Sequence, residues 1–478
     1  MPASSSIDRS LRNVALLVAA CFFMENLDGT IVTTAAPRIG RALGVPATSV
    51  SLVIAAYLVT LAVLIPLSGW LAARLGARPV FLAAIAIFTG ASLACALSTS
   101  LTELVAFRVL QGAGGAMMVP VGRLVVLART AKADVLRIIS LLVWPALIAP
   151  VVAPLAGGLL TTYASWRWLF AVNVPLGVIA WGFAWRLIFS GSRAPVAPLD
   201  VPGVLLTCAG LAAATYLAQL CAQPVVDWPL AIGLAVAAGA LLSAAVGHLR
   251  RAPAPLINLR TLRVTTFRAA IGSGSLFWMS LSAVPFVLTL MFQEVFHWSP
   301  VKSGALVLFV FVGNIAIKPA TTPLLRRFGF RPVLVGATAG AAATLVVIGL
   351  FTAATPLVVI AGVVMLSGVG RSVGMTGYTT IAFSDTPPEQ LRDANTLQAT
   401  AQQLSIGLGV PLGAIAIRAG APLAGLFAAH PGPGAAYTGA FALIAAVVLV
   451  ATVAALRLHS DAGSAVSRRA PQEGAEPA

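Results

Sequence analysis

The sequence predicts an all-α membrane protein of fourteen transmembrane helices, arranged as two six-helix bundles with two further helices inserted between them. The chain has 478 residues, of which 59% are hydrophobic and only 9% are charged, whereas a soluble domain carries about 25% charged residues. A transmembrane helix needs about 20 apolar residues, and fourteen segments of this kind lie between the charges, glycines and prolines. An internal repeat, described below, indicates two related halves.

We place the fourteen segments from the runs of apolar residues. In chain order they lie near Val14–Thr34, Ser49–Leu71, Val80–Leu97, Glu103–Leu127, Leu136–Thr162, Trp168–Phe189, Val201–Cys221, Trp228–His248, Thr266–Phe292, Val301–Leu325, Val333–Thr352, Pro356–Thr380, Asn395–Arg418 and Ala435–Leu456. They divide the chain into a cytoplasmic N-terminus at 1–13, an N-terminal six-helix bundle at 14–190, two inserted transmembrane helices at 199–249, an amphipathic cytoplasmic linker at 250–265, a C-terminal six-helix bundle at 266–457 and a disordered cytoplasmic tail at 458–478.

The basic residues set the expected orientation. The net charge of +16 comes from 30 Lys and Arg against 14 Asp and Glu. In a soluble protein this excess would suggest nucleic-acid binding, but here most basic loop residues fall in alternate loops, such as those with Arg74, Arg78, Arg326 and Arg327. The positive-inside rule places these loops and both termini in the cytoplasm. We expect a multi-pass protein of a bacterial inner membrane, monomeric, with the lipid bilayer as a partner and no nucleic acid.

A short pattern occurs once in each half of the chain. Pro66, Arg74, Gly76, Arg78, Pro79 and Val80 recur with the same spacing as Pro319, Arg327, Gly329, Arg331, Pro332 and Val333. Each copy ends one apolar segment and turns into the next. Repeats of this kind are typical of transporters in which two halves surround a site near the middle of the membrane.

Four segments carry a family resemblance. They are Leu27–Pro37 (LDGTIVTTAAP), Gly69–Arg78 (GWLAARLGAR), Arg108–Gly112 (RVLQG) and Ala149–Gly158 (APVVAPLAGG). Together, in this order, they resemble the signatures of the major facilitator superfamily, in its fourteen-spanner drug:proton antiporter branch, which includes multidrug-efflux proteins. The resemblance implies that fold, alternating access, a role for Arg108 in proton transfer, and conformational roles for the following residues of the second and fourth motifs: Gly69, Arg74, Gly76, Arg78, Pro150, Pro154, Gly157 and Gly158.

The chain also departs from the family pattern. Ala73 stands where the family usually has an aspartate that caps a helix and holds the outward-facing state, so we expect a weakened latch. Ala149 and Ala153 replace glycines of the antiporter motif, which allows close helix packing but less tightly.

Two acids lie deep within an apolar segment and are candidates for proton coupling. Glu25 and Asp28 are three residues apart and share one helix face. Two close carboxylates interact, which favours protonation of at least one of them. The alternatives are that Asp28 binds the backbone or a hydroxyl group, and that Arg108 forms a structural salt bridge to the first helix.

Several polar residues of the apolar segments are candidates for cargo binding. Lys318 and Arg371 lie within apolar runs with no acid nearby, where a charge is costly unless it faces water, a partner or a ligand. Arg123 is a further candidate, although its side chain could instead extend to the membrane surface. Candidate cavity-wall residues are Asn314, Gln398 and Gln402, and inter-helix hydrogen bonding is nearly as good an explanation for the two glutamines.

These residues predict a secondary active exporter of small molecules that is driven by the proton gradient, with protons and the cargo as its small partners. The C-terminal half offers cations and no acid within its spans, which favours an anionic cargo such as a carboxylate or a metal–carboxylate complex. The alternatives are a multidrug antiporter for lipophilic cations and a non-transporting membrane sensor. We expect no enzymatic activity, no cofactor and no metal site.

Overall fold

The computed structural model describes residues 9–127, 130, 135–188, 198–222, 226–253, 255, 258–387, 390–427 and 434–459. Helices are the regular secondary structure of the described residues, so the predicted all-α class is confirmed. The first group contains α1 (Arg9–Leu43), η1 (Ala47–Val50), α2 (Ser51–Leu75), α3 (Ala77–Leu97), α4 (Leu101–Leu127), α5 (Val135–Tyr163), α6 (Trp168–Ala171) and α7 (Asn173–Leu187).

The remaining helices follow the predicted order. They are α8 (Val201–Ala222), α9 (Trp228–Arg251), η3 (Leu259–Arg263), α10 (Thr265–Leu290), η4 (Met291–Val295), α11 (Pro300–Ala316), α12 (Lys318–Phe328), α13 (Phe330–Gly349), α14 (Leu357–Ser384), α15 (Leu391–Phe427) and α16 (Ala435–Leu456). Among the described residues, 12 helices are long and apolar enough to cross a membrane, and α11 with α12 forms one more span bent by 49°. Within α5, Ile148–Tyr163 is a shorter apolar helix.

Two predicted spans are each divided into two helices. The span expected at Val301–Leu325 bends at Ile317, directly before Lys318 and Pro319. Proline lacks a backbone N–H and its ring clashes with the preceding turn, which explains the bend. The span expected at Trp168–Phe189 is divided into α6 and α7 at Val172. Lys318 therefore begins a helix, whereas the sequence prediction placed it inside the span Val301–Leu325.

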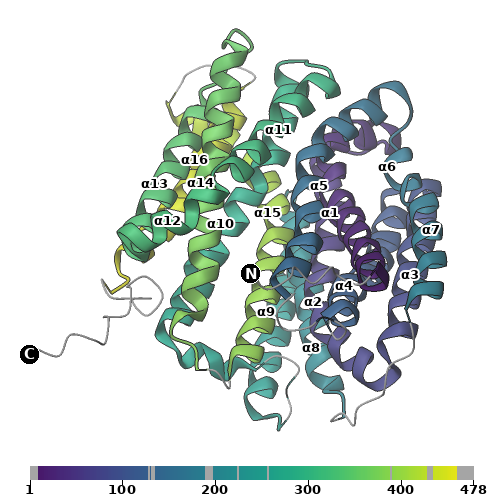
Figure 1. Ribbon diagram of the computed structural model, residues 1–478. Helices are drawn as coiled ribbons and strands as arrows, with labels where there is room; N and C mark the ends of the chain where they lie inside the picture. The colour runs from purple at the N-terminus through teal and green to yellow at the C-terminus, as the bar shows by residue number, and fades with distance from the viewer. Residues whose placement is uncertain are drawn as a thin grey trace, which may run out of the picture.

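The helices pack as two groups that meet along two seams (Figure 1). In the first group α1 packs against α5 and α4, α2 packs against α4, and α3 packs against α4 and α7. In the second group α10 packs against α14, α15 and α16, α11 against α14, and α13 against α14 and α16. The seams are formed by α2 with α15 and by α5 with α11. Any site between the groups is therefore bordered by these four helices.

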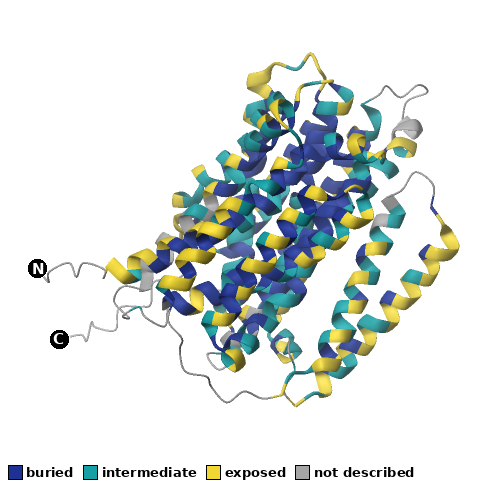
Figure 2. Ribbon diagram, turned by 90° about the vertical axis from the view of Figure 1, so that its right-hand side faces the viewer, coloured by how far each residue is buried: buried dark blue, intermediate teal, exposed yellow. Residues whose placement is uncertain are grey.

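The pair α8 and α9 stands at the edge of the molecule (Figure 2). The two helices pack against each other, and α8 also contacts both α2 and α15, one from each group. The His248 Nε2 atom lies 2.6 Å from Asp200 Oδ1 at one end of the pair, and Arg418 of α15 donates to the carbonyl oxygen of Cys221 at the other. The pair α8 and α9 thus packs, through α8, against the seam that α2 and α15 form.

The sequence repeat corresponds to a structural repeat. Gly76 ends α2 with φ of 98° and Gly329 ends α12 with φ of 78°. This left-handed region suits glycine because it has no Cβ. Each glycine donates its N–H to the carbonyl oxygen four residues earlier, in Ala72 and Leu325, at 3.0 Å. The same turn therefore joins α2 to α3 and α12 to α13.

Some predictions concern residues outside the described ranges. These are most of the expected N-terminal segment, most of the expected C-terminal tail, and residues 254, 256 and 257 of the expected amphipathic linker. The described part of that linker includes η3, at Leu259–Arg263.

Candidate functional site

A cavity of about 190 Å³ lies between the two helix groups, near the middle of the helices that form the seams. Its walls come from α1, α2 and α5 on one side and from α11, α14 and α15 on the other. The lining residues are Glu25, Asn26, Gly29, Thr30, Tyr57, Leu58, Leu61, Pro150, Phe311, Asn314, Ile315, Arg371, Met375, Gln403 and Ile406. One acidic residue, Glu25, and one basic residue, Arg371, thus line the cavity from opposite helix groups.

Glu25 is the acid of this cavity. It lies on α1, and its Oε2 atom is buried without a hydrogen-bond partner. Tyr57 of α2 also lines the cavity, and its hydroxyl donates to the backbone carbonyl of Glu25 at 3.4 Å. A buried carboxylate oxygen without a partner is costly when it is charged. This carboxyl group is therefore free to take up a proton or to bind a ligand.

Arg371 is the basic residue of this cavity, and it lies on α14 of the other helix group. Its Nη1 atom donates to the carbonyl oxygen of Leu281 at 2.6 Å, and its guanidinium carbon lies 6.0 Å from the centroid of the Phe311 ring. The Nε atom is buried without a hydrogen-bond partner. Within the described ranges no carboxylate lies within ion-pair distance of Arg371. The guanidinium therefore keeps unused capacity for an anion.

Asp28 does not line the cavity and instead forms a buried ion pair with Arg108 of α4. Both residues are almost completely buried, with 1% and 0% of their surfaces exposed. The other carboxylate oxygen, Oδ1, accepts hydrogen bonds from Gln111 Nε2 at 3.0 Å and from Asn173 Nδ2 at 2.8 Å. Both carboxylate oxygens of Asp28 thus already accept hydrogen bonds from side chains of the protein.

Arg108 extends this network across the first helix group. Its Nε donates to the carbonyl oxygen of Val53 on α2 at 3.3 Å, and its guanidinium carbon lies 4.0 Å from the centroid of the Tyr57 ring. Gln111 in turn donates to Ser92 Oγ on α3 at 2.7 Å. The network joins α1, α2, α3, α4 and α7. The alternative of a structural salt bridge between Arg108 and the first helix matches this geometry.

Sequence reasoning assigned no role to several residues of the cavity and the network. Gln111 was visible only as part of the third motif, and Asn173, Tyr57, Asn26 and Gln403 carried no separate signal. Gln111 follows Arg108 by three residues, so the two side chains share a helix face. That spacing could have indicated a joint role in binding Asp28.

Arg123 lies further along α4, outside the lining of the cavity. Its side chain is exposed, and its guanidinium carbon lies 5.0 Å from the centroid of the Phe22 ring on α1. The charges of Arg123 and Glu25 attract each other. Arg123 thus contributes to the electrostatic field at Glu25 without bordering the cavity.

The other predicted cargo residues divide between the cavity and its surroundings. Asn314 lines the cavity, whereas Lys318 does not and donates from Nζ to Thr376 Oγ1 at 3.1 Å. Gln398 and Gln402 of α15 do not line it either, although the adjacent Gln403 does. Gln398 is buried, with neither atom of its amide group bonded. The wall of the cavity on α15 is thus formed by Gln403 and Ile406 and not by the predicted Gln398 and Gln402.

Two arginines of the predicted conformational motif contact the first helix group. Arg78 donates from Nη2 to the carbonyl oxygen of Trp185 on α7 at 2.9 Å. The guanidinium carbon of Arg74 lies 5.5 Å from the centroid of the Trp70 ring. Gly69 has open space where a Cβ would lie. Arg78 thus ties α3 to α7, whereas Arg74 packs along its own helix, α2.

The groups close tightly around one end of the cavity. Gly158 of α5 faces the start of α11, where an added Cβ would lie 2.6 Å from the carbonyl oxygen of Pro300. One turn away, a Cβ on Gly304 of α11 would collide with the carbonyl oxygen of Pro154. Gln293 of η4 donates to the carbonyl oxygen of Thr34 on α1 at 3.0 Å. All these contacts lie on the side away from Gly76 and Gly329.

Replacing Gly158 by valine should separate α5 from α11 at this closed end. We expect thermal unfolding in detergent to show a loss of about 1–3 kcal/mol, because a side chain forced into a close contact displaces the helices. Gly182→Val on α7 is the matched control, because nothing lies within 4 Å of its added Cβ. Equal melting temperatures for the two variants would show that the α5–α11 contact is not tight.

Comparison with known proteins fixes the family. The sequence profile described as Major Facilitator Superfamily matches residues 18–410. The chain belongs to this superfamily. The resemblance noted in the four motifs is thereby confirmed. Members of the superfamily are transporters, and the family is not one of enzymes.

Relatives and solved structures agree with this assignment. The chain is 34% identical over 401 residues to proteins of Salmonella paratyphi A and Salmonella typhimurium that bear the name multidrug resistance protein MdtD, covering 83% of this chain and 84% of each relative. Its fold is similar to that of the POT family transporter PepTSo (TM-score 0.65, 14% identity, 94% of this chain and 99% of the other). It is also similar to that of the human organic anion transporter MFSD10 (TM-score 0.58, 14% identity, 93% and 99%).

Proposed function

We propose that this superfamily member is a proton-coupled exporter of small molecules in the inner membrane of a bacterium, with both termini in the cytoplasm. The observation that carries the proposal is the cavity between the helix groups, where Glu25 of one group and Arg371 of the other each keep a buried polar atom, Oε2 and Nε, without a hydrogen-bond partner. Rocking of the two groups about such a cavity would expose it to each side in turn. The relatives named for multidrug resistance support export as the direction.

Glu25 is the proton-carrying residue in this proposal. Its carboxylate has a buried oxygen without a partner, and it lies on a helix that belongs to only one of the moving groups. Asp28 is less suited to the same task because Arg108, Gln111 and Asn173 already satisfy it. We therefore assign Asp28 and Arg108 to holding α1 against its neighbours, so that Glu25 keeps its place in the cavity.

Arg371 is the cargo-binding cation in this proposal. A planar guanidinium can bind a carboxylate through two parallel hydrogen bonds, and Arg371 uses Nη1 on the carbonyl oxygen of Leu281, which fixes its orientation. The nearby amides of Asn314 and Gln403 offer further donors. An anionic cargo would thus bridge Arg371 and the first helix group.

Replacing Arg371 by glutamine should weaken binding of a carboxylate. A hydrogen bond to a charged group contributes about 1.5–3 kcal/mol, which corresponds to a ~10–100-fold loss of affinity. Isothermal titration of the purified protein with mono-, di- and tricarboxylates would measure it. Arg186→Gln, at an exposed position of α7, is the matched control. Unchanged affinity of the Arg371 variant for every acid that the natural protein binds would contradict an anionic cargo.

A second candidate function is export of lipophilic cations. The name of the relatives supports it, and Glu25, Tyr57 and Phe311 of the cavity could hold a cation by charge and aromatic contact. Under this alternative the Arg371 variant would bind ethidium as tightly as the natural protein or more tightly, while carboxylates would not bind to either. The two candidates therefore give opposite results in the same titration.

A further inference from the structure

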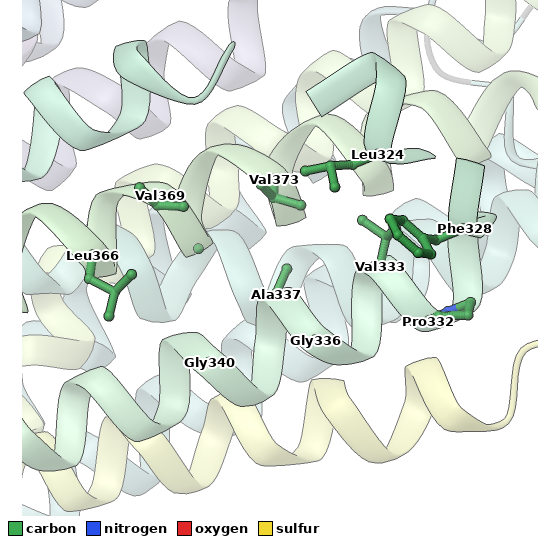
Figure 3. Close-up of a pocket in the computed structure, with 11 residues that line it drawn as sticks. Leu324, Phe328, Pro332, Val333, Gly336, Ala337, Gly340, Leu366, Val369 and Val373 are labelled. Carbon is green, nitrogen blue, oxygen red and sulfur yellow. The ribbon is translucent and has the colours of Figure 1, made fainter. Parts of the chain in front are cut away.

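A second hollow lies outside the central cavity, between α12, α13 and α14 (Figure 3). It has a volume of about 470 Å³ and shares no lining residue with the central cavity. Apolar residues and glycines alone line it, namely Leu324, Phe328, Pro332, Val333, Gly336, Ala337, Gly340, Leu366, Val369, Gly370 and Val373. A ligand here would bind by its hydrocarbon part.

This groove faces the surroundings of the protein. Gly336 and Gly340 of α13 are exposed, and a Cβ added to either would meet nothing within 4 Å. Phe328 and Leu366 are 55% and 56% exposed. The helices α12 and α13 lie at the outer edge of the second group (Figure 1). In a membrane, hydrocarbon must therefore fill the groove.

One end of the groove is positively charged. The Arg327 guanidinium carbon lies 5.4 Å from the centroid of the Phe328 ring, and Arg331 precedes Pro332 in the turn that starts α13. Arg326, Arg327 and Arg331 form no ion pair with a described acid. The groove thus joins an apolar channel to a group of unpaired cations at the end of α12.

We propose that this groove binds one anionic phospholipid, with an acyl chain along Gly336 and Gly340 and the phosphate beside Arg327 and Arg331. The apolar lining suits the chain, and basic residues at a membrane surface attract anionic head groups. A second copy of this protein is a poorer occupant, because two-fold pairing over this groove would bring the same arginines together. Bound lipid would fill the space between α13 and α14 during transport.

Photolabelling of the full-length protein tests this assignment. Purified protein is mixed with phosphatidylglycerol that carries a diazirine in its acyl chain, irradiated and digested, and labelled peptides are mapped by mass spectrometry. We expect labelling within residues 324–340 and 366–373, with phosphatidylglycerol competing better than phosphatidylcholine. Gly340→Leu and Gly336→Leu should each lose most of this labelling, whereas the control Gly362→Leu, also exposed and with no atom near its added Cβ, should retain it.

The head-group contact has its own test. Arg327→Gln and Arg331→Gln should each reduce the preference for phosphatidylglycerol over phosphatidylcholine about fivefold. Equal competition by the two lipids in the natural protein would overturn the proposal, as would unchanged labelling in both leucine variants. A dimer in the natural protein that Gly340→Leu dissociates would assign the groove to a second copy and would also overturn it.

Discussion

Replacing Arg108 by alanine should lower the free energy of unfolding by about 3–5 kcal/mol, because it leaves the Asp28 carboxylate buried without its counter-charge. Asp28 would keep hydrogen bonds from Gln111 and Asn173, but these are neutral amides. The loss of the guanidinium would also remove the contact with the Tyr57 ring and the bond to the Val53 carbonyl. Thermal unfolding in detergent, followed by size-exclusion chromatography, would measure the effect.

The matched control for this change is Arg186→Ala, which removes an exposed arginine from α7. A melting temperature near that of the natural protein is expected for the control. Asp28→Asn should fall between the two, since it removes the acid but keeps a polar group for the network. If Arg108→Ala melted with the control, the network would not hold the first helix group together.

Replacing Glu25 by glutamine should abolish coupling to the proton gradient while leaving downhill exchange of cargo. A gradient of one pH unit stores about 1.4 kcal/mol per proton, which suffices for a ~tenfold accumulation of cargo. We therefore expect proteoliposomes with the natural protein to accumulate cargo to about that ratio per proton exchanged. Proteoliposomes with the Glu25 variant should reach equal concentrations on both sides.

The same flux assay separates Glu25 from Asp28. If Asp28 has a structural role, Asp28→Asn should lower the yield and the stability of the protein. The molecules that still fold should retain coupling to the proton gradient. Full accumulation by Glu25→Gln together with none by well-folded Asp28→Asn would reverse the two assignments.

The order and approximate bounds of most helices could be predicted because a run of about 20 apolar residues indicates a transmembrane helix. The runs near Val80–Leu97 and Ala435–Leu456 correspond closely to α3 and α16. The breaks at Val172 and Ile317 were missed because hydrophobicity does not register a bend. Pro319 was visible in the sequence, but proline within a membrane helix can also be tolerated without a break.

The site was predicted less well, for a physical reason. Glu25 and Asp28 share one helix face, so spacing alone could not show that one faces the cavity and the other faces Arg108. The partners of Asp28 lie on α4 and α7, far away in sequence. Arg371 and Asn314 were found because a polar group within an apolar run needs a reason. Lys318 is likewise a charged residue within an apolar run, but it does not line the cavity and donates a hydrogen bond to Thr376.

The central claim is that Glu25 and Arg371 share one water-filled cavity between the helix groups, and cysteine labelling tests it most directly. With the four native cysteines replaced by alanine, Gln403→Cys would report on the cavity wall and Gln398→Cys on a buried site of the same helix. A membrane-impermeant thiol reagent should modify position 403 rapidly from the face that carries Arg74 and Arg327, and position 398 much more slowly. Equal, slow reaction at both positions from either face would contradict the account.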